Sequence, residues 1–182
     1  MSKLKELTWA HHQAAERRKF AKELLSGSID PKLYHKFLTC QYMNYNVLEQ
    51  ATIIPPHLNK IHRARRIFQD IRELEEAFGL EPDGIFPPSV NEYASRIAML
   101  QESDNNHGLL AHMYVRHFGE LHGGQMIKKK IPGNGLMYEF AGDTKYLIEE
   151  FRKLLDDDMA EEAKICFDFA SQLFDELSVD IS

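Results

Sequence analysis

The chain has 182 residues, 43% hydrophobic and 27% charged, which suits one domain over residues 1–182 with a sizeable buried core. A formal net charge of −6 argues against a nucleic-acid-binding protein, whose surface would be basic. No run approaches the roughly 20 apolar residues of a membrane-spanning helix, and the first residues lack the apolar centre of a signal peptide, so no membrane association is expected.

The expected elements are all helices, because apolar residues recur at helical spacing and no segment of useful length alternates with period two. In chain order they cover residues 3–25, 30–51, 58–78, 89–102, 109–130, 143–157 and 160–178. Glycine and proline residues separate them, as at Ser26-Gly27, Pro55-Pro56 and Pro132-Gly133. The pattern predicts an all-α, single-domain bundle packed around one core.

The first expected helix carries two adjacent histidines, His11 and His12. Glu16 lies one turn after His12, where its carboxylate can accept a hydrogen bond from Nδ1–H and leave Nε2 facing outward to bind a metal. His11 is five residues from Glu16, which is a poorer spacing. The other histidines without a partner at ligand spacing, His35, His57, His62, His107 and His112, are expected to be surface or helix-face residues.

Helix 109–130 contains three glycines, Gly119, Gly123 and Gly124, although glycine is unfavourable in a helix. Together they cost about 3 kcal/mol relative to alanine. Two arrangements would compensate: close contact with a neighbouring helix, or a bent helix whose bare backbone lies against a flat ligand. The glycine spacing alone does not decide between them.

The residues around these glycines resemble a known family. Tyr114-Val-Arg-His-Phe-Gly-Glu-Leu-His-Gly-Gly-Gln125 resembles the distal-helix signature of the haem oxygenase family, Tyr-x-Arg-Tyr-Leu-Gly-Asp-Leu-Ser-Gly-Gly-Gln. Residues 4–16 are similar to the family's first helix, in a register that places the proximal histidine at His12, and residues 165–177 resemble its last helix. The resemblance implies a haem-oxygenase-like helical bundle with a glycine-kinked distal helix.

The resemblance also implies how haem b, both cofactor and substrate, would be held. His12 would bind the iron, oriented by Glu16, and the backbone at Gly119 and Gly123 would crowd the opposite face, where O2 binds. The propionates and the pocket wall would be contacted by Lys5, Tyr114, Arg152, Phe167 and Phe174.

Catalytic roles carry over with changes. Glu120 stands where the family has aspartate and would supply protons through water, supported by Arg116 and Tyr45. Its side chain is one methylene longer, and Ala170 replaces an expected asparagine. His117 and His122 also replace family residues, and either would make the iron six-coordinate and inert if it pointed at the metal.

The implied reaction opens haem to biliverdin, usually the alpha isomer, with release of carbon monoxide and ferrous iron. Electrons must come from outside, because the sequence has no nucleotide fingerprint and no iron–sulfur cysteine set. Lys128-Lys-Lys130 is a candidate dock for an acidic donor such as ferredoxin, or else complements the helix dipole. A bilin reductase is a candidate downstream partner.

The main alternative is a haem-binding or haem-storage protein without turnover, given the changes at Glu120 and Ala170. Di-iron proteins need Glu-x-x-His pairs, and thiamin-processing enzymes need an activated nucleophile; the sequence shows neither. Cys40 and Cys166 lie far apart in expected helices and resemble reduced core thiols, which favours a cytoplasmic protein. A monomer is expected.

Overall fold

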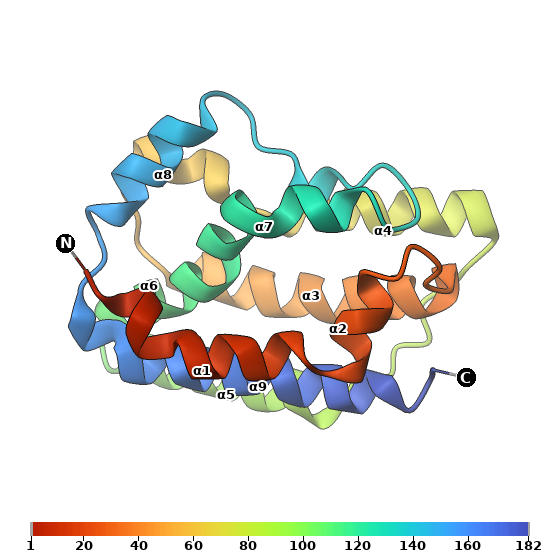
Figure 1. Ribbon diagram of the computed structural model, residues 1–182, viewed down its shortest axis with the longest axis horizontal. Helices are drawn as coiled ribbons and strands as arrows, with labels where there is room; N and C mark the ends of the chain where they lie inside the picture. Colours follow the sequence, from red (N-terminus) through yellow and green to blue (C-terminus); the bar gives the residue numbers. More distant parts are fainter. Residues whose placement is uncertain (1, 182) are drawn as a thin grey trace.

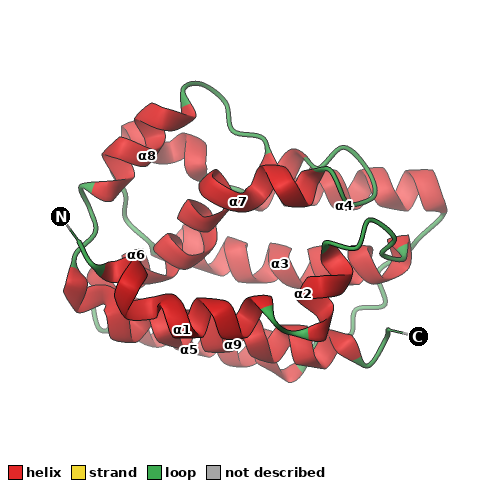
Figure 2. Cartoon of the chain, in the orientation of Figure 1, coloured by secondary structure: helices red, strands yellow, loops and turns green. Residues whose placement is uncertain are grey.

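The computed structural model describes residues 2–181, so Met1 and Ser182, the ends of the expected domain, lie outside it. Within those residues the regular structure is entirely helical, and the predicted all-α class is confirmed (Figures 1 and 2). The α-helices are α1 (Leu4–Glu16), α2 (Lys19–Leu24), α3 (Pro31–Ala51), α4 (Ala64–Phe78), α5 (Pro88–Glu102), α6 (Asn106–Met113), α7 (Gly119–Lys128), α8 (Thr144–Arg152) and α9 (Ala160–Ser178). Short helices of other types are η1 (Pro56–Ile61), η2 (Tyr114–Phe118), η3 (Leu136–Tyr138) and η4 (Asp157–Met159).

The first expected helix, 3–25, is in fact two helices. Arg18 has an extended backbone, with φ −64° and ψ 147°, and separates α1 from α2. The turn lets Phe20 enter the core, where its ring lies 5.6 Å from that of Phe174 on α9, while the Arg18 guanidinium bonds Asp175 at 3.1 Å. Tertiary burial of Phe20 therefore outweighs the local helical pattern.

The expected helix 58–78 begins only at Ala64. The preceding residues form η1, and Glu49 of α3 accepts hydrogen bonds from the backbone N–H groups of Arg63 and Ala64. Those groups are among the unpaired donors of a new helix, so Glu49 caps α4 from 15 residues earlier in the chain. A cap from another helix cannot be recognised in the local sequence.

The helices pack around α3 and α9. α3 lies against α4 and α5, and α9 lies against α1, α2 and α6. In Figure 1, α1 runs along α9 on the near side of the molecule and α7 lies above it. The core is built from large side chains of the two central helices and their neighbours, including Phe37, Leu38, Tyr45, Leu48 and Cys166. This packing fixes α1 and α7 on one side of the bundle.

The expected distal helix, 109–130, is a continuous helical run made of α6, η2 and α7. The Asn105 side chain caps it by accepting the Gly108 N–H. Residues 114–118 form a π-helical turn, and the run changes direction between α6 and α7 in Figure 1. Gly119, directly after this turn, keeps helical dihedral angles of φ −59° and ψ −42°. The irregular turn therefore comes before the glycines. That the glycines cause the bend remains a prediction.

Candidate functional site

The three glycines of α7 have two different environments. A Cβ atom added at Gly119 or Gly123 would meet no other atom within 4 Å, whereas one added at Gly124 would lie 2.8 Å from the ring of Tyr138. Gly119 and Gly123 are one turn apart and share a face of the helix. Gly124 therefore shows close packing, one of the two compensations considered from the sequence, whereas Gly119 and Gly123 present bare backbone to open space.

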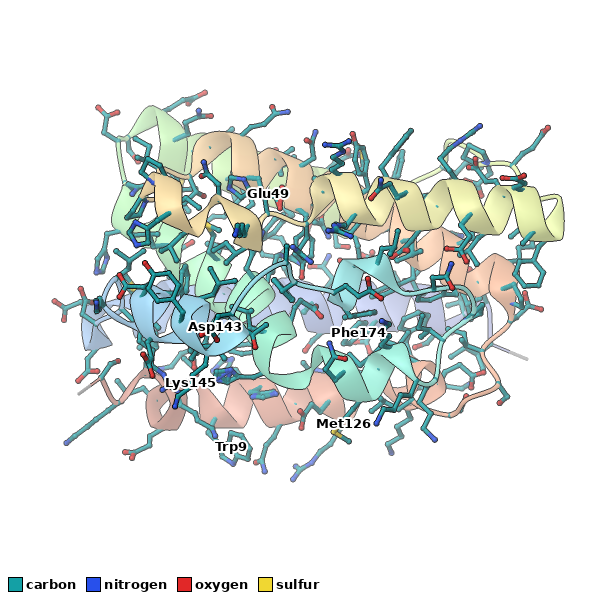
Figure 3. The ribbon with its side chains drawn as sticks, turned by 90° about the horizontal axis from the view of Figure 1, so that it is seen from above. Trp9, Glu49, Met126, Asp143, Lys145 and Phe174 are labelled. Carbon is teal, nitrogen blue, oxygen red and sulfur yellow. The ribbon has the colours of Figure 1, made fainter. Side chains whose placement is uncertain are left out.

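α1 lies on the same side of the molecule as this bare face. Figures 1 and 3 both show α1 and α7 on the same side of the molecule, and Figure 3 shows Trp9 of α1 and Met126 of α7 along one edge. His12 projects from α1 with its side chain 38% exposed. Its ring stacks on Phe167 of α9 at 5.3 Å between centroids, with 10° between the planes. The aromatic contact holds the imidazole in place without enclosing it.

Glu16 pairs with His12 as its position predicts, but through the other ring nitrogen. Nε2 of His12 lies 2.8 Å from Oε1 of Glu16, whereas Nδ1 was expected to make this contact. Nε2 is the outermost ring nitrogen and reaches the carboxylate one turn away, so binding of a metal by Nε2 requires the ring to turn. His11 is held elsewhere, with Nδ1 2.9 Å from Asp168 on α9.

Glu120 is the acidic group of the distal helix. Its Oε1 accepts a 3.1 Å hydrogen bond from the Tyr45 hydroxyl, and its buried Oε2 has no hydrogen-bond partner among the described residues. Burial raises the pKa of the Glu120 carboxyl to about 7, although the Tyr45 hydrogen bond and the charges of Arg63 and Arg116 act in the opposite direction. The carboxyl group can therefore both hold and release a proton near neutral pH.

Arg116 belongs to a buried chain of polar side chains that the sequence analysis missed. Its Nε donates a 3.0 Å hydrogen bond to the Tyr93 hydroxyl, which shares a 2.9 Å hydrogen bond with Nδ1 of His112. Nε2 of His112 lies 2.8 Å from Glu162, which Arg96 also contacts. Burial raises the pKa of Glu162, but the hydrogen bonds from His112 and Arg96 outweigh it and bring the pKa down to about 2.

His112 corrects an expectation, since it is fully buried rather than a surface or helix-face residue, and buried His35 is a second correction. Each has a carboxylate partner, Glu162 for His112 and Glu75 for His35. These carboxylate partners lie 50 and 40 residues away in the chain, so the spacing of neighbouring residues could not reveal them. The apolar surroundings of His112 in residues 109–115 were the available signal.

The two histidines considered as possible second iron ligands lie in different places. His117 is fully buried, with Nε2 3.0 Å from Glu49 in the core, and burial lowers its pKa. His122 is exposed on α7, with Nε2 3.5 Å from the guanidinium of Arg152. His117 is thus committed to a core contact, whereas His122 borders the bare face of α7.

Lys5 and Arg152, the expected cationic propionate ligands, come from α1 and α8, and the charges of both act on His122. Burial and then the positive charges of Arg152 and Lys5 lower the pKa of His122, which places all three groups in one electrostatic neighbourhood. Tyr114 is half-buried beside Thr8 of α1, and burial raises its pKa. Lys5 and Arg152 each lie 5.8 Å from an aromatic ring, of Trp9 and Phe118 respectively.

The two phenylalanines expected in the pocket wall are separated by the structure. Phe167 stacks on His12, but Phe174 packs in the core against Phe20 and Phe37, 5.6 Å and 6.3 Å away between ring centroids. Figure 3 labels Phe174 within the bundle. Two turns of α9 separate the residues, so only Phe167 reaches the imidazole of α1.

These residues fit a flat, iron-containing ring with carboxylate groups. They provide an accessible imidazole, an open backbone face and a set of cations, and the orphaned Oε2 of Glu120 adds a buried proton site. Within residues 2–181, no three His, Cys, Asp or Glu side chains gather closely enough to hold a metal ion by themselves. No helix in the same range is both long and apolar enough to cross a membrane.

Comparison with known proteins gives a consistent family. The family model described as Heme oxygenase matches residues 1–176. Heme oxygenase 2 of Macaca fascicularis is 30% identical to this chain over an alignment that covers 96% of the chain. The same alignment spans only 64% of the length of that relative. The heme oxygenase of Rhodella violacea is 29% identical, with coverages of 96% and 85%.

Solved structures agree in fold over nearly the whole chain. The structure of heme oxygenase-1 from the cyanobacterium Synechocystis, in complex with heme, superimposes with a TM-score of 0.83 and 25% identity, covering 97% of this chain and 91% of that one. The Leptospira interrogans heme oxygenase gives a TM-score of 0.81 at 25% identity, with coverages of 95% and 97%. The chain described here therefore belongs to the haem oxygenase family.

Proposed function

We propose that this chain binds haem as cofactor and substrate and uses O2 and external electrons to open it to biliverdin, releasing carbon monoxide and ferrous iron. The observation that carries the proposal is the bare face of α7, where Cβ atoms at Gly119 and Gly123 would meet nothing within 4 Å. Backbone free of side chains lets a flat ring approach closely. The haem complex of the Synechocystis relative supports the same substrate.

Haem, when bound, would supply the iron that activates O2 and the ring carbon that is oxidised. His12 would hold the iron through Nε2 once its ring has turned away from the present 2.8 Å contact with Glu16, and Glu16 would then orient the imidazole. Lys5, Arg152 and Tyr114 would bind the propionates, because cations and hydroxyl groups compensate carboxylate charge at a partly buried site. Held by these residues, the ring would have the bare backbone of α7 on its other side.

Glu120 would move protons on that face. Its orphaned Oε2 is the atom to hold the proton, and a pKa of about 7 lets the group give it up and regain it under neutral conditions. Tyr45 positions the carboxyl group through its hydrogen bond to Oε1, and the nearby charge of Arg116 stabilises the ionised form. Helix backbone close to the ring would leave O2 room only along the ring, which would direct attack to one edge carbon. The alpha isomer is the product that the family resemblance implies.

Electrons would come from an acidic protein such as ferredoxin, docked on the lysines that end α7. Lys128 pairs with Glu139, while Lys129 and Lys130 are exposed. Two exposed cations directly after the distal helix give an acidic protein an approach to the site. We further propose that the chain acts as a cytoplasmic monomer; its two cysteines are buried free thiols, and burial raises the pKa of Cys40 to about 12.

A turnover assay tests this function. The protein is reconstituted with haem and supplied with ascorbate or reduced ferredoxin in air, and absorption spectra are followed. Turnover predicts loss of the Soret band, growth of a bilin spectrum and an alpha-biliverdin product by chromatography. A Soret band that persists under reductant would instead identify a haem carrier, and no Soret band at all would contradict both functions.

Two variants make the assay specific to the residues proposed. Glu120→Asp restores the family's shorter acid and tests whether the longer side chain alters the rate. His12→Ala should abolish turnover through loss of iron binding. If His12→Ala turned haem over at the unmodified rate, the proposed iron ligand would be wrong even if the activity were correct.

A further inference from the structure

His122 lies on the open face of the distal helix. It is three residues after Gly119 and one before Gly123, and residues three or four apart share a helix face. Added Cβ atoms at both of those glycines would meet nothing within 4 Å. The exposed imidazole of His122 therefore stands at the border of the surface that we assign to the flat substrate.

The surroundings of His122 are cationic and come from three helices. Nε2 lies 3.5 Å from the Arg152 guanidinium of α8, and the imidazole is 4.4 Å between centroids from the Phe118 ring. The charged groups that act on it are Arg152 and Lys5 of α1, both of them positive. Two positive charges thus act on an exposed imidazole in a chain of net charge −6, which indicates a site for a substrate with more than one negative group.

We propose that His122 is a further carboxylate-binding residue of the substrate site, beside Lys5, Arg152 and Tyr114, and that it takes up a proton when a dicarboxylate ring such as haem binds. This inference rests on the proposed function and deepens it, because it makes affinity for the substrate depend on pH. It also gives His122 a role other than that of a second iron ligand.

The physical basis is a reversal of the local field. In the free protein, burial and the charges of Arg152 and Lys5 lower the pKa of His122, so its imidazole is neutral at pH 7. A bound carboxylate attracts the proton that those cations repel, which favours the imidazolium form. By linkage, if binding takes up one proton, the affinity falls by up to about tenfold for each unit that the pH rises between the free and bound pKa values.

The experiment compares the unmodified haem-free protein with His122→Gln. Each is titrated with haemin, and with its dimethyl ester, from pH 6.5 to pH 8.5, and binding is read from the Soret band. Glutamine keeps a hydrogen-bond donor but cannot take up a proton. Because both proteins share His12 and the chemistry of the iron, the ratio of their dissociation constants isolates the contribution of His122.

With haemin, we expect the dissociation constant of His122→Gln to exceed that of the unmodified protein by about tenfold at pH 6.5 and to converge with it by pH 8.5. With the ester, which has no carboxylates, the ratio should stay near one. A ratio independent of pH, or the same dependence with the ester, would overturn the inference.

Two further outcomes separate this inference from the function beneath it. A low-spin, six-coordinate spectrum that disappears in His122→Gln would show that His122 binds iron and would overturn the inference alone. Absence of haemin binding by the unmodified protein at every pH would overturn the proposed function and the inference with it.

Discussion

The Tyr45 hydroxyl donates a 3.1 Å hydrogen bond to Oε1 of Glu120, joining α3 to the distal helix. The pairing matters because Glu120 carries the acidic group of the site inside the protein, where burial raises its pKa from 4.5 to about 7. The protonated carboxyl is therefore the form that the fold favours. The stability of the protein should report this directly.

Stability should depend on pH through Glu120. Since the folded pKa exceeds the unfolded value, the stabilising contribution is complete below pH 4.5 and is lost as the pH rises through about 7. We expect the unfolding free energy of the unmodified protein, relative to Glu120→Gln, to fall by up to about 3 kcal/mol across this window. Urea denaturation at a series of pH values measures it.

Tyr45→Phe is the matched control for that experiment. It removes a hydrogen bond that lowers the pKa of Glu120, so the pH at which stability is lost should move upward. An unfolding free energy whose difference from Glu120→Gln is constant with pH would show that Glu120 titrates as an ordinary exposed carboxyl.

The two neighbouring histidines of α1 should differ sharply in haem binding. His12→Ala should lose the Soret spectrum of the haem complex and recover it with added imidazole, because the missing ligand is replaced from solution. His11→Ala breaks only a half-exposed contact with Asp168, which contributes about 0–1 kcal/mol, and should bind haem normally. The reverse pattern in a haemin titration would assign the iron to His11.

Gly123→Ala and Gly124→Ala should change stability in opposite directions. The first adds a methyl group in open space and should raise the unfolding free energy by up to about 1 kcal/mol while weakening haemin binding. The second places a methyl group 2.8 Å from the buried Tyr138 ring and should lower the unfolding free energy by about 1–3 kcal/mol. Urea denaturation and Soret titration of both variants provide the measurements. Tighter haemin binding by Gly123→Ala would contradict an approach of the ring to this face.

Electron delivery should depend on the exposed lysines after α7. We expect Lys129→Glu combined with Lys130→Glu to reduce the rate of turnover with ferredoxin by about tenfold at low salt, and to leave turnover with ascorbate unchanged. Lys32→Glu combined with Lys145→Glu changes the net charge equally at exposed positions on α3 and α8 and serves as the control. Equal losses in the two double variants would indicate a general charge effect without a specific docking surface.

The helices and the local parts of the site were predictable because the residues that indicate them lie close together in the sequence. Glu16 follows His12 by one turn, and the glycines lie within six positions of one helix. By contrast, the break at Arg18 depends on burial of Phe20 against α9. It requires a partner more than a hundred residues away, which periodicity within a segment does not reveal.

The buried chain from Arg116 through Tyr93 and His112 to Glu162 escaped prediction for the same reason. Its members come from η2, α5, α6 and α9, and only the packing of these helices brings their polar atoms together. Each residue separately resembles a core aromatic, a helix-face histidine or a surface acid. Their contacts become visible only with the tertiary structure.

Glu49 gives the molecule a mechanical connection between two distant segments. Its carboxylate contacts Nε2 of His117 in the distal helix and accepts hydrogen bonds from the backbone N–H groups of Arg63 and Ala64. Movement of the distal run that displaces His117 must therefore loosen or tighten the first turn of α4. Hydrogen–deuterium exchange at those two amides should consequently respond to haem, although both lie at the start of α4 and outside the site.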